Sequence, residues 1–253
     1  MKKLIVVMAA LALLVLGCAA MALQVSNGPL TDGTYDPLAD LRFRNFQTAV
    51  SGDYEMMICN VFDASGNAVI TSSNITIGQL PNFAYNQAAW ATNNEFWITY
   101  DPGTSLISLR LKGSGEQAGG ATGGYDITIS RAPDACVSPV NYILFELWDR
   151  APYPTFTNGL SITSLDGTPL GTFTIPSAGI GSWSIFDPSG SVLNDGFVLY
   201  GNFDLDLNML TNGKEGDKII FKVGNFTPVP EPSSIIVLAG GLVCLFPMIR
   251  RRR

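Results

Sequence analysis

Residues 95–111 read Glu-Phe-Trp-Ile-Thr-Tyr-Asp-Pro-Gly-Thr-Ser-Leu-Ile-Ser-Leu-Arg-Leu, and this stretch decides the fold class. Two apolar segments, 95–100 and 105–111, flank an Asp-Pro-Gly-Thr turn at 101–104. Proline presets φ for a turn and glycine tolerates positive φ, so apolar runs on both sides predict a β-hairpin. The hairpin is the starting point for an antiparallel β-structure.

More short strands are predicted on both sides of the hairpin, because apolar and β-branched residues recur between turn-forming ones. Turns are expected at 63–67, which is rich in Asp, Gly and Asn, and at the glycine-rich 179–181. Outside the two ends, no long window shows a helical period. The pattern predicts an all-β chain built as an antiparallel β-sandwich, jelly-roll-like. The other expected strands are 41–46, 54–61, 68–77, 126–130, 141–148, 160–165, 170–175, 182–186, 197–207 and 218–223.

The first 22 residues have the composition of a secretory signal peptide. Two lysines precede an apolar run over 4–16, which is too short to span a membrane. Ala20 and Ala22 supply the small residues that signal peptidase needs before its cleavage site. We therefore expect residues 1–22 to be removed after passage through the Sec translocon.

A lipoprotein signal is the competing interpretation of this segment. Residues 15–18 read Val-Leu-Gly-Cys, which resembles a lipobox with Cys18 as the acylated residue. Leu16 is a poor residue at its place in such a box, and a lipid anchor would be redundant with the C-terminal segment. Simple secretion is therefore the favoured interpretation.

The C-terminal end combines a proline-rich hinge, an apolar run and a positive cluster. Pro230 and Pro232 lock φ and remove backbone donors, so 227–234 is predicted to be an extended linker. Residues 235–249 carry no charge and are predicted to form a transmembrane helix of near-minimal length. A permanent anchor and a removable sorting signal both fit this pattern. Positive charges stay in the cytoplasm, which places the body on the far side of the membrane, and here they are Arg250, Arg251, Arg252 and Arg253.

The order of these parts, opening on Val-Pro-Glu-Pro-Ser-Ser at 229–234, resembles the PEP-CTERM sorting signal of exported proteins in Gram-negative bacteria. The resemblance implies an exosortase-type transpeptidase as a partner, which would remove the helix and pass the protein towards the outer surface. It implies that Pro230, Glu231 and Pro232 are processing residues. The body is similar to the "choice-of-anchor" surface ectodomains, on Trp90, Trp183 and the segments 95–101, 160–165, 196–205 and 218–224.

The body of the chain is strongly acidic. Six of the 15 basic residues and one of the 21 acidic residues lie in the two terminal signals, which leaves 9 basic and 20 acidic residues and a net charge of −11. Such a body repels phosphate backbones, so we expect no nucleic-acid partner. The predicted organisation is a signal peptide at 1–22, a lead-in at 23–40, the β-sandwich at 41–226, the linker at 227–234, the helix at 235–249 and the arginine cluster at 250–253.

Two of the four cysteines, Cys18 and Cys244, lie in the terminal signals. Cys59 and Cys136 remain in a body that is bound for an oxidising compartment, so a disulfide between them is predicted. Two buried thiols within strands are the alternative.

No histidine occurs in the chain, which excludes Ser-His-Asp and Cys-His activation and histidine zinc sites. Glu146 and Asp149 are the one carboxylate pair to consider for glycosidase chemistry, and ordinary strand-end charges are the favoured interpretation. We therefore expect no catalytic residue and no enzyme activity.

Calcium is the only cofactor to consider, because extracellular acidic loops offer oxygen ligands. The favoured interpretation is turn formation for the first group of candidates and a solvated strand face for the second, so no metal site is expected. The candidates are Asp63, Ser65 and Asn67 in the first group and Asp204 and Asp206 in the second.

Tryptophans are the residues to consider for carbohydrate binding. Trp97, Trp148 and Trp183 lie within apolar strands and are expected in the core, whereas Trp90 lies among Asn and Gln in the irregular segment 79–94. The sequence predicts an exported protein of the cell surface or extracellular matrix, transiently held in the membrane, with a structural or adhesive role. A module that binds exopolysaccharide through Trp90 is the alternative, and a polysaccharide-acting enzyme is less favoured.

Overall fold

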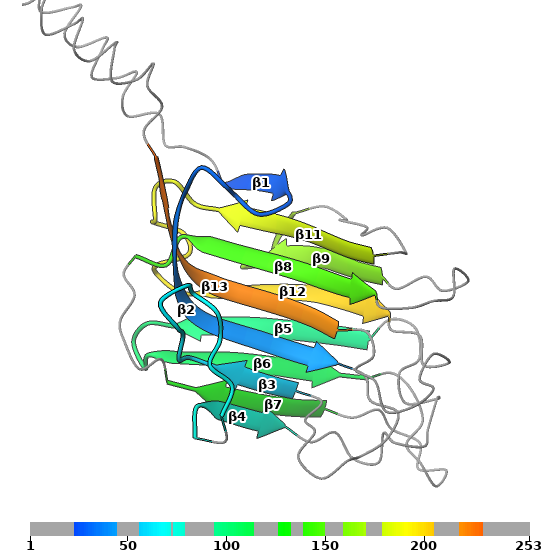
Figure 1. The fold of residues 1–253 in the computed structure, drawn as a ribbon. Helices are drawn as coiled ribbons and strands as arrows, with labels where there is room; N and C mark the ends of the chain where they lie inside the picture. Colours follow the sequence, from blue (N-terminus) through cyan, green and yellow to red (C-terminus); the bar gives the residue numbers. More distant parts are fainter. Residues whose placement is uncertain are drawn as a thin grey trace, which may run out of the picture.

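The computed structural model of the chain describes residues 23–44, 56–71, 73–78, 94–113, 126–132, 139–149, 159–170, 179–204 and 218–229. Within these ranges the regular structure is β-strand, and two antiparallel sheets of seven and six strands pack face to face (Figure 1). The predicted all-β class and the antiparallel sandwich are confirmed.

The strands of each sheet come from distant parts of the sequence. The seven-stranded sheet has the order β1 (Gln24–Asn27), β11 (Gly179–Phe186), β8 (Tyr142–Asp149), β13 (Lys218–Pro228), β2 (Gly33–Arg44), β3 (Met56–Cys59) and β4 (Ile75–Gly78). The six-stranded sheet has the order β10 (Thr168–Pro169), β9 (Gly159–Leu165), β12 (Phe197–Asp204), β5 (Asn94–Asp101), β6 (Leu106–Lys112) and β7 (Asp126–Arg131).

The predicted hairpin is confirmed as β5 and β6, which pair from Glu95 opposite Lys112 to Asp101 opposite Leu106. The Asp101 side chain closes the turn, because its Oδ1 accepts a hydrogen bond from the Gly103 amide at 2.8 Å. The second predicted turn, at 63–67, is held in the same way by an aspartate, Asp63. Both turns follow the local side-chain chemistry that makes aspartate a frequent first turn residue.

The sandwich begins earlier than the predicted boundary at residue 41, because β1 and most of β2 lie within the predicted lead-in. Strand β13 also continues two residues past the predicted end at 226. The reason is tertiary, since β2 pairs with β13 along its whole length. A register shift after Val223 accommodates Pro37, and Gly224 is required there because a Cβ would collide with the Asp36 carbonyl.

Two further strand predictions differ from the structure. The glycine-rich 179–181, expected as a turn, begins β11 and pairs with β8. Within the expected strand 68–77, regular structure starts only at Ile75. In both places pairing with a neighbouring strand, rather than local propensity, sets the boundary.

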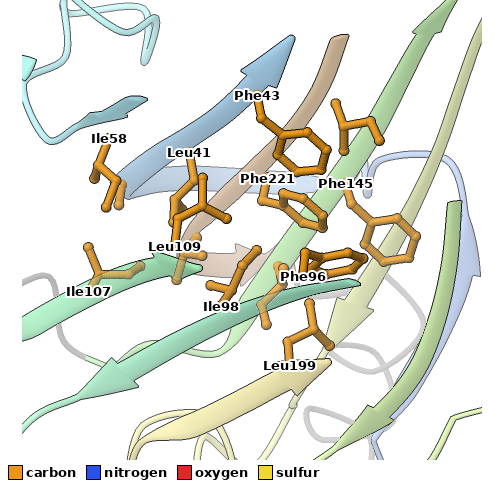
Figure 2. Close-up of a cluster of buried hydrophobic side chains, with 14 of the residues drawn as sticks. Leu41, Phe43, Ile58, Phe96, Ile98, Ile107, Leu109, Phe145, Leu199 and Phe221 are labelled. Carbon is orange, nitrogen blue, oxygen red and sulfur yellow. The ribbon is translucent and has the colours of Figure 1, made fainter. Parts of the chain in front are cut away.

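The core lies between the two sheets and is built around phenylalanines (Figure 2). Phe221 of β13 is fully buried, and its ring centroid lies 5.0 Å from that of Phe96 and 6.1 Å from that of Phe43. Phe43 also packs on Phe203 with centroids 4.6 Å apart. Aromatic rings from β2 and β13 of one sheet thus interlock with rings from β5 and β12 of the other.

Buried polar groups fix the end of the sandwich at which β13 stops. The Asn141 side chain pairs with the backbone of Phe226, accepting from its amide at 2.7 Å and donating to its carbonyl at 3.1 Å. Asp187 is 1% exposed and accepts bonds from the Ser189 hydroxyl and the Val192 amide. Burial by itself would raise the pKa of the Asp187 carboxyl. The hydrogen bonds have the larger effect, so the pKa lies below its ordinary value.

Cys59 is a free thiol in the structure, fully buried in β3. Its Sγ donates to the carbonyls of Val61 and Val69, at 3.4 and 3.5 Å. Burial raises the pKa of this thiol. The structure shows no disulfide at Cys59, and Cys136 lies outside the described residues, so a bond between the two stays a prediction.

None of the described segments forms a helix with the length and apolar character that a membrane crossing needs. The predicted signal peptide, with Ala20 and Ala22, and the tail from Pro230 to Arg253 lie outside the described residues.

We expect Phe221→Ala to lower the free energy of unfolding by about 3–5 kcal/mol, because it opens a cavity between the sheets. Equilibrium unfolding in urea measures the change. Val198→Ala is the matched control, because Val198 is 40% exposed and should change stability by less than about 0.5 kcal/mol. Equal effects of the two substitutions would contradict the position of the core.

We expect Cys59 to react with a thiol reagent slowly in the folded protein and rapidly in denaturant, because a buried thiol with a raised pKa forms little accessible thiolate. Absorbance of the released chromophore measures the rate, and Cys59→Ser identifies the signal. Rapid labelling of the folded protein contradicts the burial. A Cys59 that stays unlabelled in denaturant until a reductant is added supports the predicted disulfide instead.

Candidate functional site

The outer face of the six-stranded sheet carries the most distinctive set of side chains among the described residues. Along β5 the side chains alternate, so Phe96 and Ile98 are buried between the sheets while Glu95, Trp97 and Thr99 lie on the outer face. The prediction that Trp97 is a core residue is therefore wrong. The apolar run at 95–100 concealed this alternation, because a tryptophan on the outer face is as apolar as its buried neighbours.

Three side chains from adjacent strands form a line across this face, which we call the aromatic row. Tyr200 of β12 and Arg110 of β6 are the cross-strand partners of Trp97. The rings of Trp97 and Tyr200 lie 5.2 Å apart with a tilt of 32°, and the Arg110 guanidinium lies 4.5 Å from the centre of the Trp97 ring. Trp97 is thus flanked by a ring on one side and a cation on the other.

Charged groups fix the two neighbours of Trp97. Arg110 forms a two-pronged ion pair with Asp126 of β7, with Nε donating to Oδ1 at 2.7 Å. The Tyr200 hydroxyl donates to Glu95 Oε1 at 2.7 Å, and Lys112 Nζ lies 3.2 Å from Glu95 Oε2. The row is therefore held at both ends by bonds within the face itself.

These contacts change two pKa values. The hydrogen bond from Tyr200 lowers the pKa of the Glu95 carboxyl, with a further contribution from Lys112, and both together outweigh the opposing effect of partial burial. The same bond raises the pKa of the Tyr200 phenol, since the bond favours the protonated phenol beside a carboxylate. The pair is thus stabilised in the form in which the Glu95 carboxyl is ionised and the Tyr200 phenol is neutral.

On the other side of Tyr200 lies β9, whose outward side chains are short and hydroxylated. Ser161, Thr163 and Ser164 form this group, which we call the hydroxyl strip. Leu160, Ile162 and Leu165 of the same strand are buried, so two consecutive hydroxyl residues lie between the buried positions 162 and 165. The cause is a register shift between Tyr200 and Gly201, because a β-bulge adds one residue to a strand.

Gly201 allows this irregular pairing. A Cβ at residue 201 would lie 2.6 Å from the Phe96 ring and would also collide with the Ser161 carbonyl. Only glycine lets β9 approach β12 this closely beside Tyr200.

The other tryptophans occupy different places. Trp148, also expected in the core, lies on the outer face of the seven-stranded sheet, where Lys218 Nζ lies 4.3 Å from its ring centre and Glu146 Oε2 accepts from its indole at 3.3 Å. Trp183 packs against the core, as expected. Trp90 lies outside the described residues.

The remaining sequence candidates have structural explanations where they are described. Asp63 accepts from the amides of Ser65 and Asn67 and so forms the turn. Glu146 lies 3.5 Å from Lys222 Nζ as one half of an ion pair. Over the described ranges, no group of three or more Cys, Asp or Glu side chains is gathered as a metal site.

The aromatic row and the hydroxyl strip together can hold a ligand that has both an apolar face and many hydroxyl groups. Their side chains offer a ring face and several hydroxyl groups. No protein-family model matches the chain, and no similar protein was found among the curated proteins.

We expect the Glu95 carboxyl to titrate below the ordinary range of glutamate and to return towards it in Tyr200→Phe, which removes the hydroxyl donor. Carboxyl-carbon NMR across acidic pH measures both midpoints. Because the folded pKa is depressed, the pair stabilises the fold above the unfolded pKa, and this contribution is lost as the pH falls through the folded pKa. Equal midpoints in the two proteins would show that Tyr200 is not the cause.

Proposed function

We propose that this chain is an exported protein of the cell surface or extracellular matrix, sorted by an exosortase-type transpeptidase and acting as a structural or adhesive component. Signal peptidase and the Sec translocon serve it at the N-terminal end, with Ala20 and Ala22 before the cleavage site. Pro230, Glu231 and Pro232 are the processing residues, and the four terminal arginines hold the tail transiently in the membrane.

The observation that carries the proposal is where the sandwich ends. Strand β13 runs to Pro228, and the Val229 amide donates to the Asp32 carbonyl at 2.8 Å, directly before the Pro-Glu-Pro motif. The last strand therefore leads to the motif without a long connection, and it does so at the end of the sheet (Figure 1). A processing enzyme could reach the motif while the sandwich stays folded.

We further propose that the sandwich is a jelly roll. The strand pairs are nested: β2 pairs with β13, β5 with β12, β8 with β11, and β9 with β10. Successive pairs alternate between the two sheets, as expected for one long hairpin that is rolled up. This architecture serves binding and structural proteins of many kinds, so it supports the adhesive role only at the level of the fold.

Carbohydrate binding is the second candidate function, and the aromatic row favours it. The sequence points to Trp90 for this role, whereas the described structure offers Trp97 and Tyr200, both half-buried, on the outer face of one sheet. A polysaccharide-acting enzyme stays the less favoured candidate, because the described contacts of Glu146 are those of an ion pair with Lys222 and a hydrogen bond from Trp148.

We expect the replacement of Pro230, Glu231 and Pro232 by alanine to leave the tail attached, because the motif is then no longer recognised. Mass spectrometry of the mature C-terminus detects the retained residues, and cell fractionation locates the protein in the membrane. Thr227→Ala, exposed and three residues before the motif, is the matched control and should be processed normally. Identical C-termini in all three proteins would reject the sorting function.

A further inference from the structure

We propose that the outer face of the six-stranded sheet, on the β9 side of Tyr200, binds a neutral polysaccharide. The ligand class is inferred from the side chains of this face. Only the place where the ligand is met, the cell surface, rests on the function proposed above. The inference replaces Trp90 by Tyr200 as the central residue.

Tyr200 offers the ring face for stacking. One face of its ring is directed at Trp97, 5.2 Å away, and Trp97 is in turn flanked by Arg110. Tyr200 lies between its two cross-strand partners, Trp97 of β5 and Ser164 of β9, so the side of its ring away from Trp97 is the β9 side. Because serine is much shorter than tyrosine, a sugar ring can lie against this face with its axial C–H groups.

The hydroxyl strip supplies polar partners beside that ring. Thr163 is exposed, and Ser161 and Ser164 are half-buried on the same side of β9. Thr163 Oγ1 also donates to Asn202 Oδ1 at 3.3 Å, and the Asn202 side chain hydrogen-bonds Tyr200 as well, so Asn202 links the strip to the aromatic ring. Hydroxyl and amide groups both donate and accept, as sugar hydroxyls do, so the two surfaces match in hydrogen-bonding type.

The charges on this face argue against an anionic ligand. Arg110 and Asp126 pair with each other, and Lys112 pairs with Glu95, so the two cations are each matched by an anion. The body as a whole carries a net charge of −11, which repels polyanions over a distance. A neutral polymer meets neither of these penalties.

The size and polarity of the face fit an extended polymer rather than a protein. A polymer held beside Tyr200 can extend across the rest of the face, because the five strands from β9 to β7 span about 19 Å at a strand spacing of about 4.8 Å. Several outward positions on β5, β6 and β7 beside the aromatic row carry hydroxyl groups, namely Thr99, Ser108, Thr128 and Ser130. A protein partner would need an apolar centre, whereas the exposed large apolar side chains of this face, Val198 of β12 and Leu106 of β6, are separated by β5.

Affinity electrophoresis of the purified full chain tests the proposal, with mixed-linkage β-glucan, galactomannan and hydroxyethyl cellulose as neutral probes and alginate as the anionic one. We expect at least one neutral polymer to retard the protein. Tyr200→Ala should weaken that retention about tenfold, and Tyr200→Phe, which keeps the ring, should hold it within about threefold. Trp148→Ala, on the outer face of the other sheet, should leave it unchanged.

Thermal unfolding of each variant shows whether it is folded, and Thr163→Arg keeps the test decisive if Tyr200→Ala does not fold. Thr163 is exposed, so an arginine there should block the strip without disturbing the core, and retention should again fall about tenfold. Retention unchanged in folded Tyr200→Ala or Thr163→Arg overturns the proposal, as does the absence of retention on every neutral polymer. Stronger retention on alginate overturns the neutral class. Correct processing of the tail in a protein that binds no polysaccharide rejects this inference alone.

Discussion

The pairing of β2 with β13 is the constraint on which the rest of the structure depends. It joins residues 33–44 to residues 218–228 across almost the whole body of the chain, so its loop-closure cost is the largest of any pair in the fold. Only a long ladder with buried side chains offsets that cost, and β13 supplies one by pairing on its other side with β8. Phe221, at the centre of this three-strand unit, then meets Phe96 of the opposite sheet.

The position of the candidate site follows from the same packing of the two sheets. Because β5 and β12 must bury Phe96 and Phe203 against the seven-stranded sheet, their alternate residues Trp97 and Tyr200 are placed on the outer face. The close approach of β9 at Gly201 serves packing on the inside and, through the bulge, sets two hydroxyl residues beside Tyr200 on the outside. The pairing register of these strands thus determines both which side chains are buried and which lie on the outer face. A slip by one residue would move the buried side chains to the outer face and the outer ones into the core.

What could be read from the sequence was local. The hairpin at β5 and β6 and the turn at Asp63 follow from the conformational preferences of Asp, Pro and Gly, and both are found where the sequence predicts them. The part of β2 before residue 41 could not be recognised, because Pro37 and its neighbours favour a loop until β13 supplies a partner with a glycine opposite. The role of Trp97 was missed for a different reason: hydrophobicity alone does not tell a buried ring from one that lies on a sheet face beside Tyr200.

The ion pairs of the outer face bear on orientation rather than on stability. The side chains of Arg110 and Asp126 are 42% and 46% exposed, and pairs of this kind contribute only about 0–1 kcal/mol to folding. The ion pair with Asp126 nevertheless keeps the Arg110 guanidinium over Trp97. Glu95 restrains the Tyr200 ring by accepting a hydrogen bond from the Tyr200 hydroxyl. Since the fold is held by the phenylalanines between the sheets, the face can lose these contacts and stay folded. The buried phenylalanines that hold the two sheets together and the outer-face side chains of the candidate site are therefore largely separate sets of residues.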